Sequence, residues 1–135
     1  MSTPEEVVQE FCAAFATKDV DTISSLLADD VVYHNVGMAP AVGKDASVAM
    51  IQGFLDMAEK MTFEIHRIAA NGDSVLTERT DTFTINGADS PVAVMGTFDL
   101  RDGKIVAWRD YFDMGLITKM MSGEAVDPAV LPVFG

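Results

Sequence analysis

Residues 75–85 read VLTERTDTFTI, and their apolar and polar side chains alternate with the period of two that predicts a β-strand. One face of this strand carries Val75, Arg79, Asp81, Phe83 and Ile85. A carboxylate on such an apolar face is costly to bury unless it is paired, protonated or used in chemistry. The stretch therefore predicts a strand with a polar site on an otherwise apolar face.

A second stretch with the same property is IVAWRDYFD at residues 105–113, where one face carries Val106, Trp108, Asp110 and Phe112. Arg109 points to the opposite face from Asp110, so these neighbours are not natural partners. Two carboxylates with Arg79 nearby suggest acid–base chemistry. The alternatives are a structural ion pair between Arg79 and Asp81, and a solvated strand edge around Asp110.

The remaining chain predicts helices followed by strands. Thr3, Pro4 and Glu6 have the spacing of a helix N-terminus, and apolar residues at helical spacing follow them. Two further helices are predicted near 19–28 and 46–59, a short strand at 31–36, and further strands at 62–70, 74–85, 92–100 and 104–114. This order predicts an α+β fold, in which helices cover one face of a curved, mainly antiparallel sheet.

The tight turn around Asp102 and Gly103 governs the register of the last two strands. A two-residue turn would pair Asp110 with Met95, whereas a three-residue loop would pair Asp110 with Val94. We prefer the three-residue loop, because it places the apolar residues of both strands on one coherent surface.

The preceding connection, at 86–91, looks looser. If Ile85 lies opposite Val92, then Asp81 lies opposite Gly96. The two carboxylates are then expected on strands that flank a position without a side chain.

The bulk composition narrows the classes of protein. The chain has 135 residues, which suits a single domain over 1–135. Its net charge is −12, from 21 acidic and 9 basic residues, which argues against nucleic acid or an anionic membrane as partner. We expect a small ligand that is neutral or weakly polar.

The single cysteine, Cys12, cannot form an internal disulfide and is expected to be a small buried hydrophobic residue. No apolar run approaches the roughly 18 residues of a membrane span. The first residues are acidic and lack the basic region of a signal peptide, so we expect a cytoplasmic protein.

Several motifs together resemble the limonene-1,2-epoxide hydrolase family. They are the pair Tyr33-x-Asn35, the pair Arg79-x-Asp81, Gly96-x-Phe98, and the strings DGKI at 102–105 and WRDYFD at 108–113. The resemblance covers nearly the whole chain. It places the chain among the SnoaL-like and nuclear-transport-factor-2-like proteins, which include ketosteroid isomerases and polyketide cyclases. It implies a cone-shaped fold around an apolar pocket, and a homodimer.

The resemblance also implies site residues and their roles. Asp110 would be the general base that takes a proton from water, and Tyr33 and Asn35 would hold that water. Asp81 would be the general acid that protonates the epoxide oxygen, with Arg79 orienting both carboxyls. The reaction would open a hydrophobic epoxide (terpenoid, cyclic or sterol-like) to a vicinal diol in one step, without cofactor or metal. Low dielectric and proximity push the pKa values of two neighbouring acids apart, which suits these two roles.

The expected substrate pocket is lined by Met50, Phe54, Phe83, Val94, Trp108 and Phe112. His34 and His66 have no further candidate metal ligands near them at the spacing of a metal site, so no metal site is expected. The apolar tail at 124–135 is expected to cover a pocket mouth or a subunit interface.

Two other functions remain open. An isomerase or cyclase would need one base and an oxyanion donor, and would have less use for an arginine between two acids. A hydrophobic-ligand-binding protein would use the polar cluster only to orient its ligand.

Overall fold

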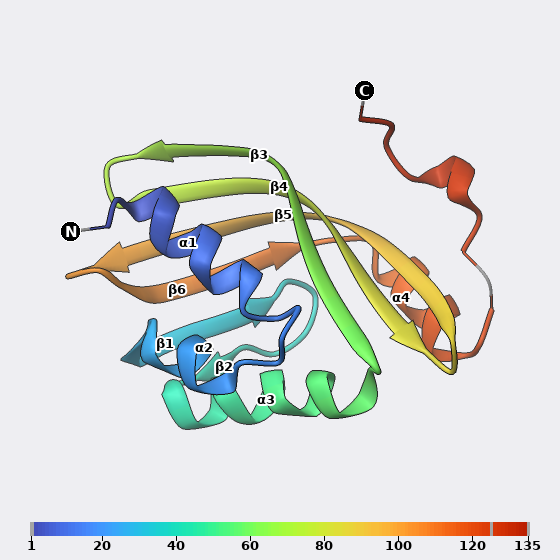
Figure 1. Ribbon diagram of the computed structural model, residues 1–135, viewed down its shortest axis with the longest axis horizontal. Helices are drawn as coiled ribbons and strands as arrows, with labels where there is room; N and C mark the ends of the chain where they lie inside the picture. Colours follow the sequence, from blue (N-terminus) through green and yellow to red (C-terminus); the bar gives the residue numbers. More distant parts are fainter. Residues whose placement is uncertain (1, 125, 135) are drawn as a thin grey trace.

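A six-stranded sheet forms the frame of the protein in a computed structural model that describes residues 2–124 and 126–134 (Figure 1). The strand order is β2-β1-β6-β5-β4-β3, and only the β1–β6 pair is parallel among the described strands. The strands are β1 (Leu27–Asn35), β2 (Ala41–Val42), β3 (Lys60–Asn71), β4 (Ser74–Ile85), β5 (Ala88–Arg101) and β6 (Lys104–Tyr111).

The helices α1 (Pro4–Ala13), α2 (Val20–Ser25) and α3 (Lys44–Met57) precede most of the sheet, and α4 (Met114–Met121) follows it. In Figure 1, α1 crosses in front of the sheet, while α4 lies at the far end of the long, bent strands β3, β4 and β5. The predicted α+β class is confirmed. No helix in the described part of the chain is long and apolar enough to cross a membrane.

The predicted N-terminus of α1 is confirmed as a capping box. The Thr3 hydroxyl accepts a hydrogen bond from the Glu6 amide at 3.2 Å, and the Glu6 carboxylate accepts one from the Thr3 amide at 2.9 Å. This cap starts a helix whose buried face includes Phe11. The Phe11 ring packs edge-on against Trp108 of β6 at a centroid distance of 5.0 Å, so α1 covers the inner face of the sheet.

The register expected for β5 and β6 is wrong. Arg101 pairs with Lys104 across a two-residue turn, and a β-bulge then shifts the register between Asp99 and Leu100. Asp110 therefore lies opposite Gly96, not Val94. The extra residue restores the expected parity of Trp108 and Asp110, although Ile105 rather than Val106 is fully buried.

The register expected for β4 and β5 is also wrong. The connection is a tight turn at Asn86 and Gly87, which both have positive φ values, 52° and 76°. This is the backbone conformation that two-residue hairpins require, and Asn-Gly is its usual sequence. Asp81 therefore pairs with Val92, and Gly96 pairs with Thr77.

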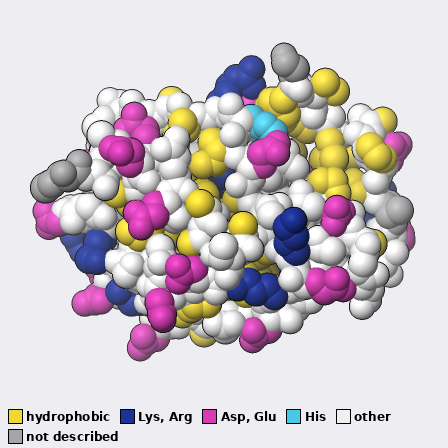
Figure 2. Space-filling view, in the orientation of Figure 1, with side chains coloured by type: hydrophobic (Ala, Val, Ile, Leu, Met, Phe, Trp, Pro, Cys, Tyr) yellow, Lys and Arg dark blue, Asp and Glu magenta, His cyan; other side chains and the backbone are white. Residues whose placement is uncertain are grey.

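The surface reflects the acidic composition, since Asp and Glu side chains are scattered over the whole visible face in Figure 2. The apolar C-terminal tail lies only partly within the described residues, because Ala125 and Gly135 fall outside them. The Phe134 ring stacks on His66 of β3 at 3.6 Å. Among the described residues after α4, none lines the large apolar cavity of the protein, so they do not form its mouth.

Candidate active site

A cavity of about 440 Å³ opens between the inner face of the sheet, α3 and α4. Its lining is largely apolar and contains six methionines: Met38, Met50, Met57, Met61, Met120 and Met121. Five of the six residues expected in the pocket do line it, namely Met50, Phe54, Phe83, Val94 and Phe112. The sixth, Trp108, is fully buried beneath the cavity and is not part of its lining.

Four polar side chains contribute to this lining: Tyr33, Asn35, Asp81 and Asp110. All four are buried, with exposed fractions of 7% or less. They come from β1, β4 and β6, and the sheet brings them to one place. The expected site residues thus converge on one end of an apolar cavity.

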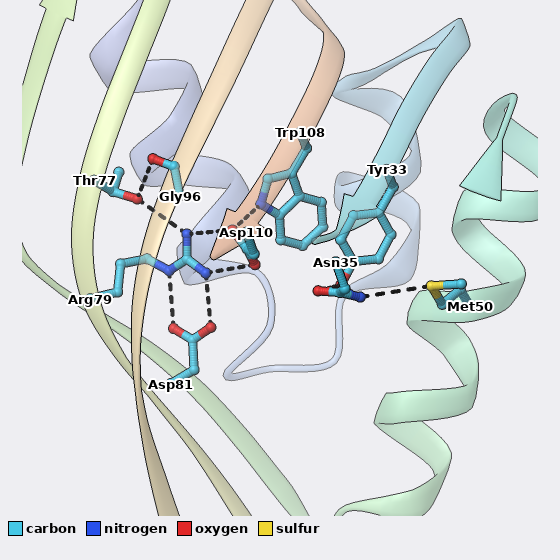
Figure 3. Close-up of polar contacts among 9 residues, drawn as sticks. All are labelled: Tyr33, Asn35, Met50, Thr77, Arg79, Asp81, Gly96, Trp108 and Asp110. Atoms are coloured by element: carbon cyan, nitrogen blue, oxygen red, sulfur yellow. Dashed lines mark hydrogen bonds and ion pairs between the residues drawn. The ribbon is translucent and has the colours of Figure 1, made fainter. Parts of the chain in front are cut away.

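The Arg79 guanidinium lies between the two carboxyls and joins them (Figure 3). Its Nε and Nη2 donate to the two oxygens of Asp81 at 3.0 and 2.8 Å. Its Nη1 and Nη2 donate to the two oxygens of Asp110 at 3.2 and 2.9 Å. Because such paired contacts fix the plane of each carboxyl, both acids are held rigidly.

The surroundings of Arg79 complete its hydrogen bonding. Its Nη1 also donates to Thr77 Oγ1 at 3.1 Å, and the Thr77 hydroxyl donates to the Gly96 carbonyl at 3.3 Å. The guanidinium lies 4.8 Å from the centroid of the Phe63 ring, which adds a favourable cation–π contact. Arg79 is completely buried, so its orientation is set by these partners alone.

The parallel pairing of β1 with β6 arranges the other polar groups. Asn35 lies opposite Asp110, and Tyr33 lies opposite Trp108. The Asn35 amide donates to the Tyr33 hydroxyl at 3.1 Å. The Trp108 indole donates to Asp110 Oδ1 at 2.7 Å.

Sequence reasoning missed the contacts of Thr77 and Trp108. Each lies two residues before a charged site residue, Arg79 or Asp110, and therefore shares its strand face. That parity was a usable signal. It does not by itself show whether a neighbour on the face contacts the charged group or lies beside it.

The electrostatics of the cluster favour one retained proton. Burial raises the pKa of Asp81 to about 6; Arg79 opposes this shift, while the nearby Asp110 adds to it. Burial also tends to lower the pKa of Arg79, but Asp110 and Asp81 outweigh it and raise the value, so Arg79 stays charged. Burial raises the pKa of Tyr33, which keeps its phenol protonated.

A charge count leads to the same conclusion. One buried guanidinium neutralises one carboxylate, and a second ionised carboxylate would leave a net charge in the protein interior. Asp110 accepts hydrogen bonds from Arg79 twice and from Trp108, whereas Asp81 accepts only the two from Arg79 among the described residues. The ionised form of Asp81 is therefore stabilised by fewer hydrogen-bond donors than that of Asp110. In the part of the chain that the structure describes, no three His, Cys, Asp or Glu side chains converge as a metal site would require.

Comparison with known structures first defines the class. The fold matches a nuclear-transport-factor-2-like protein of unknown function from Burkholderia pseudomallei with a TM-score of 0.80 at 22% identity, over 90% of this chain and 99% of that one. It also matches the structure of a limonene-epoxide-hydrolase-like epoxide hydrolase from Mycobacterium tuberculosis with a TM-score of 0.75 at 36% identity, over 89% and 90% of the two chains.

The sequence then identifies the family. Residues 2–123 match the model of the limonene-1,2-epoxide hydrolase catalytic domain. Epoxide hydrolase EphG of Mycobacterium tuberculosis is 40% identical over 109 residues, which cover 79% of this chain and 71% of that protein. The chain belongs to the limonene-1,2-epoxide hydrolase family. The expected enzyme class, an epoxide hydrolase, is thereby confirmed at the level of the family.

Proposed function

We propose that this protein adds water to a hydrophobic epoxide in one step, by general acid–base catalysis without a cofactor, and releases a vicinal diol. The observation that carries the proposal is Arg79, which holds two buried carboxyls side by side at the polar end of an apolar cavity. Epoxide opening needs a base for the attacking water and an acid for the leaving oxygen. One neutral and one ionised carboxyl supply both.

Asp110 is the general base in this proposal. It lines the cavity next to Asn35, which lies opposite it on the parallel strand. Asn35 and Tyr33 contact each other and both face the cavity, so a water held by their side chains lies within reach of Asp110. A positioned base of this kind contributes roughly 10²–10⁴-fold in rate.

Asp81 is the general acid. Its carboxyl lines the cavity from the other side of Arg79, and its raised pKa keeps a proton available near pH 6. The water oxygen forms a bond to an epoxide carbon while the carbon–oxygen bond of the ring breaks. One water proton passes to Asp110, the Asp81 proton passes to the alkoxide, and a proton returns from Asp110 to Asp81 before the next turnover.

The shape and lining of the cavity indicate the substrate class. A volume of about 440 Å³ with an apolar wall suits a terpenoid, cyclic or sterol-like epoxide. The methionines that line it are flexible and polarisable, so the wall can adapt to ligands of different outline. The epoxide ring is the polar part of such a substrate, and the four polar residues mark where it binds.

We also propose that the protein forms a homodimer through the outer face of the sheet. That face exposes Leu76 of β4, Met95 of β5 and Tyr111 of β6, each about half exposed at 47%, 47% and 48%. Burial of neighbouring apolar side chains favours association. Light scattering on the purified protein tests this, and a monomer at micromolar concentration would contradict it.

The decisive experiment is a single turnover with excess enzyme in ¹⁸O-labelled water, using limonene-1,2-oxide and a sterol epoxide in the presence of a chelator. We expect diol formation, with the label already present in the first diol. A first diol without label would show a carboxylate nucleophile instead. Deuterium exchange into a ketosteroid without diol would favour an isomerase, and tight binding without turnover would favour a ligand-binding protein.

A further inference from the structure

Trp108 is a buried residue that contacts the candidate site through its indole N–H. It is 0% exposed, lies beneath the cavity, and gives its indole N–H to a carboxylate oxygen of Asp110 at 2.7 Å. This is the shortest hydrogen bond of the cluster in Figure 3. A hydrogen bond to an ionised group is about twice as strong as a neutral one. Trp108 therefore stabilises the Asp110 carboxylate in addition to packing in the core.

The two oxygens of Asp110 differ because of this contact. Oδ1 accepts hydrogen bonds from Trp108 Nε1 and from Arg79 Nη1, which occupies both of its lone pairs. Oδ2 accepts only from Arg79 Nη2 at 2.9 Å among the described residues, and one lone pair stays available. The atom that can take a proton from water is thus Oδ2.

The same indole ring also supports Tyr33. The two rings stack at a centroid distance of 4.0 Å with an angle of 10° between their planes. Phe98 stacks on Trp108 at 5.7 Å, and Phe11 packs edge-on at 5.0 Å. Held by these neighbours, the indole cannot turn without displacing the base and the phenol together.

We propose that Trp108 is a positioning residue for water activation. Its indole N–H occupies Asp110 Oδ1, so that Oδ2 is the oxygen that takes the proton, and its ring holds Tyr33 in place beside Asp110. The inference rests on the proposed function, because it assigns Trp108 a part in the same hydrolysis. Trp108 does not line the cavity, so its effect belongs in the chemical step and not in substrate binding.

A first test needs no turnover. Trp108 is the only tryptophan of the chain, so a ¹H–¹⁵N spectrum contains one indole N–H signal. We expect this signal downfield of a solvent-exposed indole, and we expect Asp110→Asn to move it upfield. The matched Asp81→Asn variant leaves it nearly in place. The proposal would be overturned if the indole N–H has the chemical shift of an exposed indole, or if Asp110→Asn leaves its chemical shift unchanged.

The kinetic test replaces Trp108 by 3-benzothienylalanine, which keeps the ring size and removes the N–H; Trp108→Phe serves as the encoded variant. We expect kcat to fall roughly tenfold or more with KM nearly unchanged, since a charge-assisted hydrogen bond is lost. Loss of a donor favours the protonated carboxyl, so the acidic limb of the kcat–pH profile moves to higher pH. The alkaline limb stays in place.

Phe11→Leu is the matched control, because it loosens the packing around Trp108 and leaves the indole N–H intact. We expect it to lower the melting temperature without moving the acidic limb. If the benzothienylalanine variant has the same kcat and the same pH profile as the wild type, the inference is overturned. Diol formation by the wild type would still uphold the proposed function in that case. If the wild type forms no diol, the proposed function fails and the inference with it, while the indole signal still reports the contact.

Discussion

The guanidinium of Arg79 lies directly over Gly96, in the space that any other residue would fill with its side chain. A Cβ on Gly96 would clash with Arg79 Nη1, and it would come within 2.6 Å of Asp110 Oδ1. The backbone of Gly96 does not have the positive φ that favours glycine. Glycine is needed here for space alone, because Arg79 must cross from its own strand to Asp110 two strands away.

We therefore predict that Gly96→Ala inactivates the enzyme. A displacement of about 1 Å at a positioned catalytic group can cost roughly 100-fold in rate, so we expect kcat/KM for diol formation to fall at least about 100-fold. Gly53→Ala is the control, since a Cβ there meets nothing within 4 Å. In α3 it should stabilise the fold by about 0.5–1 kcal/mol and leave activity unchanged. An active Gly96→Ala would contradict the placement of Arg79.

We predict that activity declines as the pH rises above about 6. Burial holds the pKa of Asp81 near this value, and the acid works only while it is protonated. The measurement is kcat/KM between pH 5 and pH 9, which reports the free enzyme. The alkaline limb of the kcat–pH profile should lie at higher pH than that of kcat/KM, because a bound apolar substrate excludes water and further favours the neutral form of Asp81. If kcat/KM stays constant up to pH 8, Asp81 is not the general acid.

We predict that Asp81→Asn abolishes activity but gains stability relative to the wild type as the pH rises. The folded-state pKa of Asp81 is raised above its ordinary value of 3.8. Its contribution to the free energy of unfolding is therefore fully present below pH 4 and is lost as the pH rises through about 6. The substituted asparagine side chain cannot ionise, so the variant escapes this loss. Urea denaturation of both proteins at pH 4.5 and pH 8 checks the trend, and an equal difference at both pH values would refute it.

We predict that Arg79→Met destabilises the protein by about 3–5 kcal/mol at pH 8, because it removes the cation that pairs with two buried carboxyls. The loss should shrink at pH 4.5, where Asp81 with its raised pKa is protonated and uncharged. Arg101→Met is the control, since Arg101 pairs with Asp30 at the surface and is half exposed. That change should stay within about 0.5 kcal/mol. The same loss at both pH values would mean that packing, and not charge, dominates at Arg79.

The sequence predicted the elements of the fold well, because local rules govern them. The strands expected at 62–70 and 74–85 correspond to β3 and β4, and the helix expected at 46–59 corresponds to α3. The strand faces were also largely predicted, since side-chain direction follows the period of two. Phe83, Asp81 and Arg79 share a face for this reason alone.

Strand register was predicted less well, since it depends on turn geometry and bulges. Asn86-Gly87 forms a tight hairpin turn, and Asn-Gly is the usual sequence of such turns, so the looser connection expected at 86–91 is wrong. The bulge between β5 and β6 left no recognisable signal. It is favoured by burial of Ile105 and Trp108 on the same face, a requirement of the packed core.

By itself, the sequence determined which residues face the interior and, through its motifs, the family to which they belong. The tertiary structure decided that Gly96 lies beside Asp110, that the Trp108 indole donates a hydrogen bond to Asp110, and that one buried arginine binds both carboxyls. The physical reason is that side-chain parity is set within a strand, whereas pairing across strands is set by the whole core. In the proposed function, Asp81 and Asp110 can act as acid and base because that pairing brings Arg79 between them.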